Sequence, residues 1–119
     1  MLIEPNSDLV DYSMSGLINK NPVKETATII NENGVRVIEV LLAPESRGEW
    51  HYHSHISESC YCLKGQLSID IEGSKAVILR PGEKCKVAAG IRHSVYNETP
   101  ISCVFLVIQG IGEYDFIKN

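Results

Sequence analysis

The histidines of this 119-residue chain gather at two places, and their spacing is typical of a metal site. His51, His53 and His55 alternate along one segment, and His93 lies far downstream. On a β-strand, residues two apart point to the same face and lie about 6.6 Å apart along the strand. Two imidazoles that lean toward a point between them can share one ion at about 2.1 Å from each nitrogen. His51 and His53 are therefore candidate metal ligands.

A carboxylate and the distant histidine could complete such a site. Glu58 lies five residues after His53, so a straight strand would aim its side chain at the opposite face. A bulge or bend around residues 54–57 would restore the phase and turn the carboxylate inward. With His93, three neutral imidazoles and one carboxylate would hold one divalent ion and leave positions open for water or substrate. The plainer alternative is that these residues are solvated strand histidines and an exposed loop carboxylate.

The cysteines match neither a zinc site nor a disulfide framework. Zinc sites generally use two close Cys or His pairs, whereas only Cys60 and Cys62 lie close together here. We therefore expect Cys60, Cys62, Cys85 and Cys103 to be buried structural thiols. Because Cys60 and Cys62 alternate in phase with Glu58, they would face the interior and form an oxidisable wall beside the ligands.

The chain from about residue 25 onward reads as short strands separated by turns, with no sustained helical period. Residues 31–34, Asn-Glu-Asn-Gly, predict a hairpin because Asn and Gly tolerate positive φ. Turns that recur at this interval indicate an all-β sandwich or barrel. We expect a short helix or an irregular arm over residues 7–18 and a tail over residues 110–119. The strands are expected over 26–30, 35–43, 48–55, 59–63, 67–71, 76–79, 84–87, 93–96 and 102–109.

Two segments of the chain resemble the two motifs of the cupin family. The first motif is matched by His51-x-His53, then four residues, Glu58, six residues and Gly65. The second is matched by a segment in which alanine stands where the motif usually has proline. This segment reads Gly82, five residues, Ala88-x-Gly90, two residues, His93, three residues and Asn97. The glycine that normally precedes the first motif by a longer gap is out of register, because Gly48 lies too close to His51.

The resemblance implies a double-stranded β-helix, a jelly-roll barrel of two antiparallel sheets with metal ligands inside it near one mouth. We expect one domain over residues 1–119 with the barrel core at about 35–109. The resemblance makes His51, His53, Glu58 and His93 the ligands of one divalent ion, which would be Fe, Mn, Zn or Ni, with Cu also known in the family. His55 falls outside the ligand positions, so it is expected at the rim or beside the ligands, although a swap with His51 stays open.

The tail carries a distinctive group of polar residues after the last strong strand. Gln109, Glu113 and Tyr114 could reach the mouth of the barrel, where Gln109 would contact the ligands or a substrate. A tail that simply docks on the protein is the interpretation that the sequence favours.

Composition and charge exclude some classes of function. Apolar residues make up 44% of the chain and charged residues 22%, as in a typical globular protein. The net charge is −4 and the basic residues are scattered, which argues against binding to nucleic acid. A small neutral or cationic partner is easier to accommodate. No membrane-length apolar segment and no secretion signal is apparent, so we expect a cytoplasmic protein that does not bind membranes.

Two functions fit the predicted metal pocket. The first is an enzyme that acts on a small polar molecule by metal-assisted oxygenation or isomerisation. Oxygenation needs fewer protein groups, whereas isomerisation also needs a separate acid or base. The second is a non-catalytic module that binds or senses a small molecule. A homodimer is expected in either case, because the apolar strand over residues 35–42 could supply an outer face for pairing.

Overall fold

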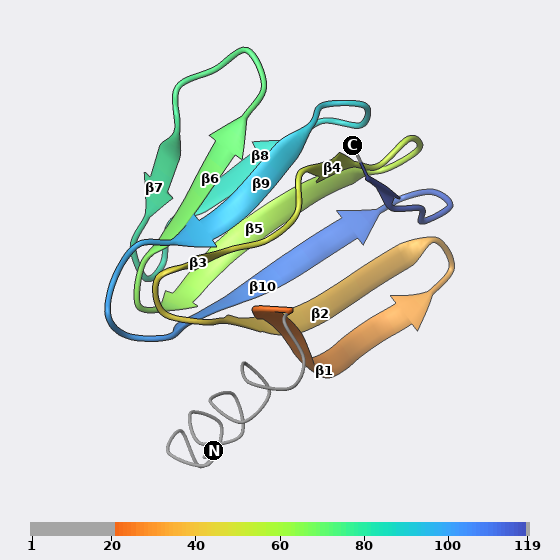
Figure 1. The fold of residues 1–119 in the computed structure, drawn as a ribbon. Helices are drawn as coiled ribbons and strands as arrows, with labels where there is room; N and C mark the ends of the chain where they lie inside the picture. The colour runs from red at the N-terminus through yellow and green to blue at the C-terminus, as the bar shows by residue number, and fades with distance from the viewer. Residues whose placement is uncertain (1–20, 119) are drawn as a thin grey trace.

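The computed structural model describes residues 21–118, which form eleven strands and no helix (Figure 1). The arm or helix expected over residues 7–18 lies outside the described residues. The strands are β1 Val23–Glu32, β2 Val35–Leu42, β3 Ser46–Arg47, β4 His51–Tyr52, β5 Ser57–Lys64, β6 Leu67–Ile71, β7 Val77–Leu79, β8 Lys84–Val87, β9 His93–Asn97, β10 Cys103–Gly110 and β11 Ile117–Lys118.

Within the described residues the strands pair into two antiparallel sheets. The first sheet has the order β1-β2-β10-β5-β8. The second has the order β11-β4-β9-β6-β7, and β3 also pairs with β9. Figure 1 shows β2, β10 and β5 side by side in one layer, with β9 and β6 in the other. The predicted double-stranded β-helix is confirmed.

Strand boundaries differ from the predicted ones at two places. β1 is longer than expected, because it pairs with β2 along its whole length. The added residues are mostly polar, so the alternation of apolar and polar residues does not identify them as part of the strand. Its hairpin turn has positive φ at Asn33 (54°) and Gly34 (77°), as a tight type I′ turn requires. The single strand expected over residues 48–55 is wrong. Only His51–Tyr52 is a strand there, because the chain leaves the second sheet and crosses to the first before Ser57.

The inward residues of the first sheet line up in rows across β2, β10 and β5. Alternate residues of β10 are buried, as expected for a strand with one face on the core. Two apolar rows cross the middle of the sheet, Ile38–Val107–Cys60 and Val40–Phe105–Cys62. The next row toward the barrel mouth is Arg36–Gln109–Glu58, which we call the polar row. The same strands thus build both the core and one wall of the mouth.

The glycine at the end of the first motif is required by packing. Gly65 follows β5 with φ of +80°, in the left-handed region that favours glycine. A Cβ atom there would lie 2.7 Å from the backbone oxygen of Ser102. Only glycine therefore lets the turn after β5 approach the chain that leads into β10.

The described residues contain no helix long and apolar enough to cross a membrane.

Candidate metal centre

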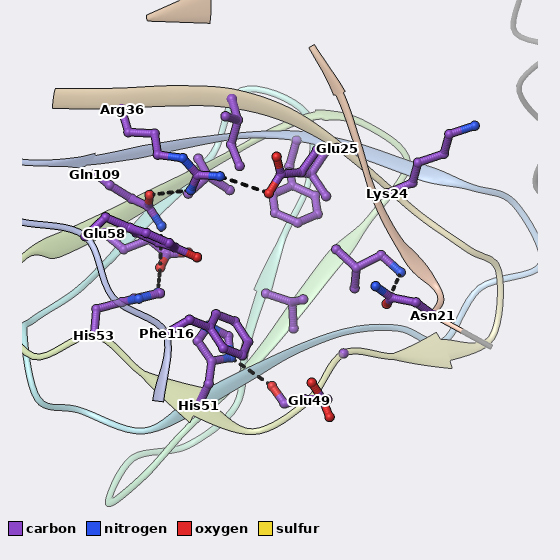
Figure 2. A pocket seen from close by; sticks show the side chains of 18 residues that line it. Asn21, Lys24, Glu25, Arg36, Glu49, His51, His53, Glu58, Gln109 and Phe116 are labelled. Carbon is purple, nitrogen blue, oxygen red and sulfur yellow. Dashed lines mark hydrogen bonds and ion pairs between the residues drawn. The ribbon is translucent and has the colours of Figure 1, made fainter. Parts of the chain in front are cut away.

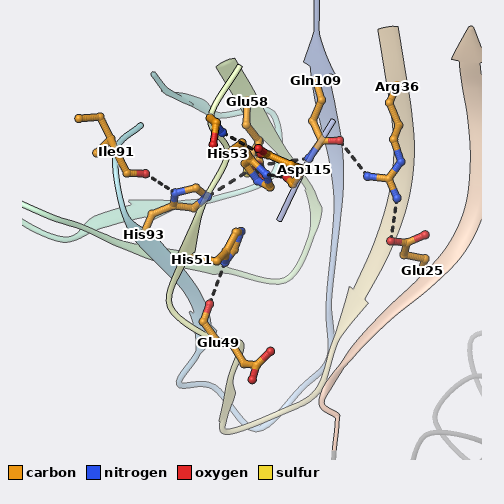
Figure 3. A network of polar contacts seen from close by, with 12 residues as sticks. Glu25, Arg36, Glu49, His51, His53, Glu58, Ile91, His93, Gln109 and Asp115 are labelled. Atoms are coloured by element: carbon orange, nitrogen blue, oxygen red, sulfur yellow. Dashed lines mark hydrogen bonds and ion pairs between the residues drawn. The ribbon is translucent and has the colours of Figure 1, made fainter. Parts of the chain in front are cut away.

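Four side chains from strands far apart in the sequence converge at the mouth of the barrel (Figure 3). His51 and His93 are register partners on β4 and β9, His53 follows β4, and Glu58 lies on β5. Each offers one ligand atom, and within the described part of the chain these four atoms lie within 4.8 Å of one another. All four side chains are buried.

The bend predicted around residues 54–57 brings Glu58 inward. The chain bends at Ser54 and His55, between β4 in the second sheet and β5 in the first. Glu58, the second residue of β5, is 6% exposed. A change of sheet, rather than a bulge within one strand, therefore restores the phase between His53 and Glu58.

Each of the three imidazole rings is held by a backbone carbonyl. The carbonyl oxygens belong to Glu49 (2.8 Å from Nδ1 of His51), Asp115 (2.6 Å from Nδ1 of His53) and Ile91 (2.9 Å from Nδ1 of His93). A carbonyl oxygen only accepts hydrogen bonds, so Nδ1 is the donating nitrogen of each ring. Nε2 is then the nitrogen left to bind an ion, with a backbone acceptor on its far side as is usual for metal-ligating histidines.

The buried Nε2 atoms lack aligned partners. Nε2 of His53 lies 2.6 Å and Nε2 of His93 3.6 Å from Oε1 of Glu58, yet neither nitrogen has a well-directed hydrogen bond among the described residues. Buried polar atoms usually have such a bond, and its absence at two nitrogens that face one carboxylate oxygen fits a shared cation. Three imidazole nitrogens and a carboxylate are a donor set that suits Fe, Mn, Zn or Ni.

The pKa values of Glu58 and His51 favour the protonation states that a metal needs, whereas that of His53 reflects its contact with Glu58. Burial raises the pKa of Glu58, but the neighbouring His53 and His93 outweigh burial and hold it below the usual value. Burial lowers the pKa of His51, which keeps that imidazole neutral. Burial also lowers the pKa of His53, but contact with Glu58 reverses the shift and raises it. Glu58 is therefore ionised at neutral pH and His51 is neutral, as metal coordination requires.

The C-terminal tail folds over the cluster instead of leaving the barrel. β11 pairs with β4, and the Phe116 ring stacks on His51 at 4.1 Å between centroids, 14° from parallel. Asp115 contributes its carbonyl to His53, and its Oδ1 accepts a hydrogen bond from the backbone N–H of Ser54 at 2.8 Å. Tyr114 also reaches the mouth, as the sequence suggested it could, but Glu113 is exposed.

Comparison with known families decides the classification. The model of the cupin domain family matches residues 38–109, more than half of the chain. The chain is a cupin. The recognised motifs and the fold agree with this membership.

Solved structures agree on the fold of this cupin. A double-stranded β-helix protein from Klebsiella pneumoniae is 17% identical with a TM-score of 0.73, over 85% of this chain and 87% of that one. Oxalate oxidase is 22% identical with a TM-score of 0.72, over 82% of this chain but only 55% of the oxidase. A Thermus thermophilus protein is 21% identical with a TM-score of 0.70, over 92% and 97% of the two chains. No curated protein sequence matches the cupin.

The residues predicted to accompany the ligands occupy different surroundings in the cupin. Gln109 is buried, and its Nε2 lies 3.4 Å from Oε1 of Glu58. Cys60 is buried with its Sγ atom 3.8 Å from Oε2 of Glu58, and burial raises its thiol pKa well above the usual value. Cys62 lies one row deeper, in the apolar core. His55 is exposed and stands outside the cluster, because it lies at the bend where the chain changes sheet.

A cavity of about 580 Å³ opens beside the candidate ligands of the cupin (Figure 2). His51, His53 and Glu58 form part of its wall, and apolar residues such as Phe105 form its floor. Figure 2 shows the guanidinium of Arg36 pointing into this space. Its Nη1 donates a hydrogen bond to Oε1 of Gln109 at 2.8 Å.

Sequence reasoning missed Arg36, although a signal for it was present. Arg36 stands in phase with Ile38 and Val40, so the alternation that marks the inward face of β2 also turns Arg36 inward. Asp115 and Phe116 had no comparable signal, because their placement depends on how an irregular tail folds back over the mouth.

Proposed function

We propose that this cupin is a metal-dependent enzyme that acts on a small polar molecule by metal-assisted oxygenation or isomerisation. One observation carries the proposal: three oriented imidazole nitrogens and a carboxylate converge on one point in the wall of a cavity large enough for a small molecule. His51, His53, Glu58 and His93 would hold the ion, which we take to be Fe, Mn, Zn or Ni.

When bound, such an ion polarises a carbonyl group or activates water or dioxygen. An ion held by these four residues would stay open to a small molecule from the cavity. The protein's own part is orientation and exclusion of water. The three backbone carbonyls hold the rings in place, and the tail shields the cluster through Tyr114 and Phe116.

The cavity offers groups for both kinds of chemistry. Oxygenation would demand little of the protein beyond the residues that hold the ion. Isomerisation needs an acid or base near the substrate, and the cavity wall supplies the Tyr114 hydroxyl. Burial raises the pKa of Tyr114, so this hydroxyl stays protonated at neutral pH and can act as an acid but not as a base.

The test is elemental analysis of protein purified without added metal, followed by turnover assays on small hydroxy, keto and carboxylic compounds. Conversion with dioxygen uptake supports oxygenation, and conversion without dioxygen supports isomerisation. Tight binding without conversion would support the alternative, a module that binds or senses a small molecule. Wild-type protein that holds no transition metal under any loading condition would overturn the proposal.

The expected assembly is part of the same proposal: a cytoplasmic homodimer that pairs through the outer face of β2. Val35 and Val37 on that face are only half-buried. Light scattering tests the assembly, and a monomer mass that does not change with concentration would contradict it.

A further inference from the structure

We propose that the cavity binds a small carboxylate, held by Arg36, with its remaining polar end toward the His/Glu cluster. This inference rests on the proposed function and names its class of substrate: a short hydroxy- or keto-carboxylic acid. The chain's net charge of −4 favours a neutral or cationic partner, but the local charge inside the cavity decides what binds there.

The guanidinium of Arg36 is held in place in the cavity wall. Its Nη1 donates to Gln109 at 2.8 Å and its Nη2 to Glu25 at 2.9 Å. The Tyr114 ring covers one of its faces at 4.4 Å. These two hydrogen bonds use two of the five N–H donors of a guanidinium. An arginine fixed in this way presents a rigid fork that matches a carboxylate.

Gln109 joins the guanidinium to the cluster and fixes its own orientation. Its Nε2 lies 3.4 Å from Oε1 of Glu58 and donates to that carboxylate, while its Oε1 accepts from Arg36. Reversing the amide would place an acceptor against the Glu58 carboxylate and a donor against Arg36. A single amide therefore spans the gap between Glu58, a candidate metal ligand, and Arg36. A carboxylic acid that reached from Arg36 to the cluster would accordingly have a short chain.

The carboxylate of Glu25 occupies the position that a bound ligand would take. It pairs with Arg36 at 2.9 Å, but its side chain is 53% exposed, whereas that of Arg36 is 18% exposed. Glu25 can therefore turn into solvent at little cost when a ligand carboxylate replaces it. Lys24 is the other cation among the described residues that line the cavity, and Figure 2 shows its ammonium group pointing away from the cavity.

The test is an NMR titration of zinc-loaded and of metal-free protein, labelled with ¹⁵N, in which the Arg36 and Gln109 side-chain signals are followed. The probes are glycolate, 3-hydroxypropionate and 4-hydroxybutyrate, each compared with its neutral primary amide. At least one carboxylate should bind with an affinity about tenfold or more above that of its amide, because the amide cannot form the charge-assisted pair.

Three variants should change carboxylate binding in three different ways. Arg36→Met should weaken binding of the carboxylate by about tenfold or more. Glu25→Gln should tighten it several-fold, because a competing carboxylate is removed. Lys24→Met, which removes a cation that points away, should leave it within about twofold, as a screened surface charge does. Circular dichroism and zinc content of each variant check that the fold and the cluster persist.

Equal affinity for carboxylate and amide would overturn the proposal, as would unchanged binding in Arg36→Met. Weaker binding in Glu25→Gln would also contradict it, and this variant keeps the test decisive if Arg36→Met fails to fold. Carboxylate binding by a wild-type protein that takes up no transition metal under any loading condition would overturn the proposed function alone. Zinc binding without any carboxylate response would overturn this inference alone.

Discussion

The apolar rows at the floor of the cavity, which we call the closed end of the barrel interior, and the polar mouth are built by the same strands with opposite chemistry. β10 contributes Phe105 to the closed end and Gln109 to the mouth, and β5 contributes Cys62 and Glu58 in the same order. The strand period of two decides which residues face inward, whereas the position along the strand decides whether an inward residue packs or binds. Inward alternation alone therefore does not mark a residue as part of the apolar core.

The ends also differ in what they need from the rest of the chain. The closed end completes itself, because its apolar rows interlock and Asn97 satisfies the local carbonyls of Leu42 and Ile101 through its Nδ2. The mouth contains buried imidazole nitrogens that have no aligned partner among the described residues. It also depends on the C-terminal tail for the carbonyl that holds His53 and for the ring that stacks on His51. Substitutions at the closed end should therefore affect stability, and those at the mouth should affect metal binding.

The largest effect is expected for His93→Ala. Removing one of the four ligand atoms should lower metal affinity by at least about 100-fold, more than is usual for loss of a group that only supports a ligand. Competition with a chelator measures this change. His55→Ala is the matched control, because His55 is exposed and outside the cluster, and it should retain the metal. Equal metal loss in both variants would mean that the cluster has been assigned wrongly.

Phe105→Ala should lower stability but leave metal binding intact, the reverse of what is expected for His93→Ala. Phe105 is 2% exposed in the apolar rows, so truncation should lower the free energy of unfolding by about 3–5 kcal/mol. Urea denaturation measures the loss, and the folded fraction should still bind one metal ion per chain. Loss of metal from folded Phe105→Ala protein would show that the two ends are not separable.

Much of this division could be predicted from the sequence, because it depends on short-range patterns. The convergence of four candidate ligands followed from the spacing of His51, His53 and Glu58 together with a second motif at His93. The bend between His53 and Glu58 followed from strand parity alone. Its cause, a change of sheet, could not be predicted, since pairing partners are set by the whole fold.

The features that could not be predicted from the sequence depend on tertiary contacts. Alternation placed Arg36 inward, but only the register of β2 with β10 sets it beside Gln109 and hence beside Glu58. The exposed position of His55 depends on the bend. The contacts of Asp115 and Phe116 arise because the tail adds β11 to the edge of the second sheet, and two residues at the end of an irregular segment carry no strand pattern of their own.

Asp115→Ala should weaken metal binding less than loss of a ligand does. The Asp115 side chain anchors the tail through the N–H of Ser54, and its carbonyl orients His53. Without the anchor, affinity should fall by up to about tenfold, the lower range for groups that support a ligand. Glu113→Ala, at an exposed position of the same tail, should leave affinity unchanged. If the two variants behave alike, the tail is not part of the metal centre.

The smallest effect is expected for Phe116→Ala. The ring is 41% exposed but stacks on His51, and such an aromatic pair contributes about 0.5–1.5 kcal/mol beyond burial. A loss of this size should lower metal affinity by about two- to tenfold, provided that stacking holds His51 in its ligating position. Ile117→Ala removes a similarly exposed neighbour that touches no ligand ring among the contacts described, so it isolates the stacking from general loosening of the tail. Phe116→Tyr retains the ring and should restore the affinity. If it does not, exclusion of water by the tail, rather than orientation of His51, links Phe116 to the ion, and the mouth then depends on the tail as a cover.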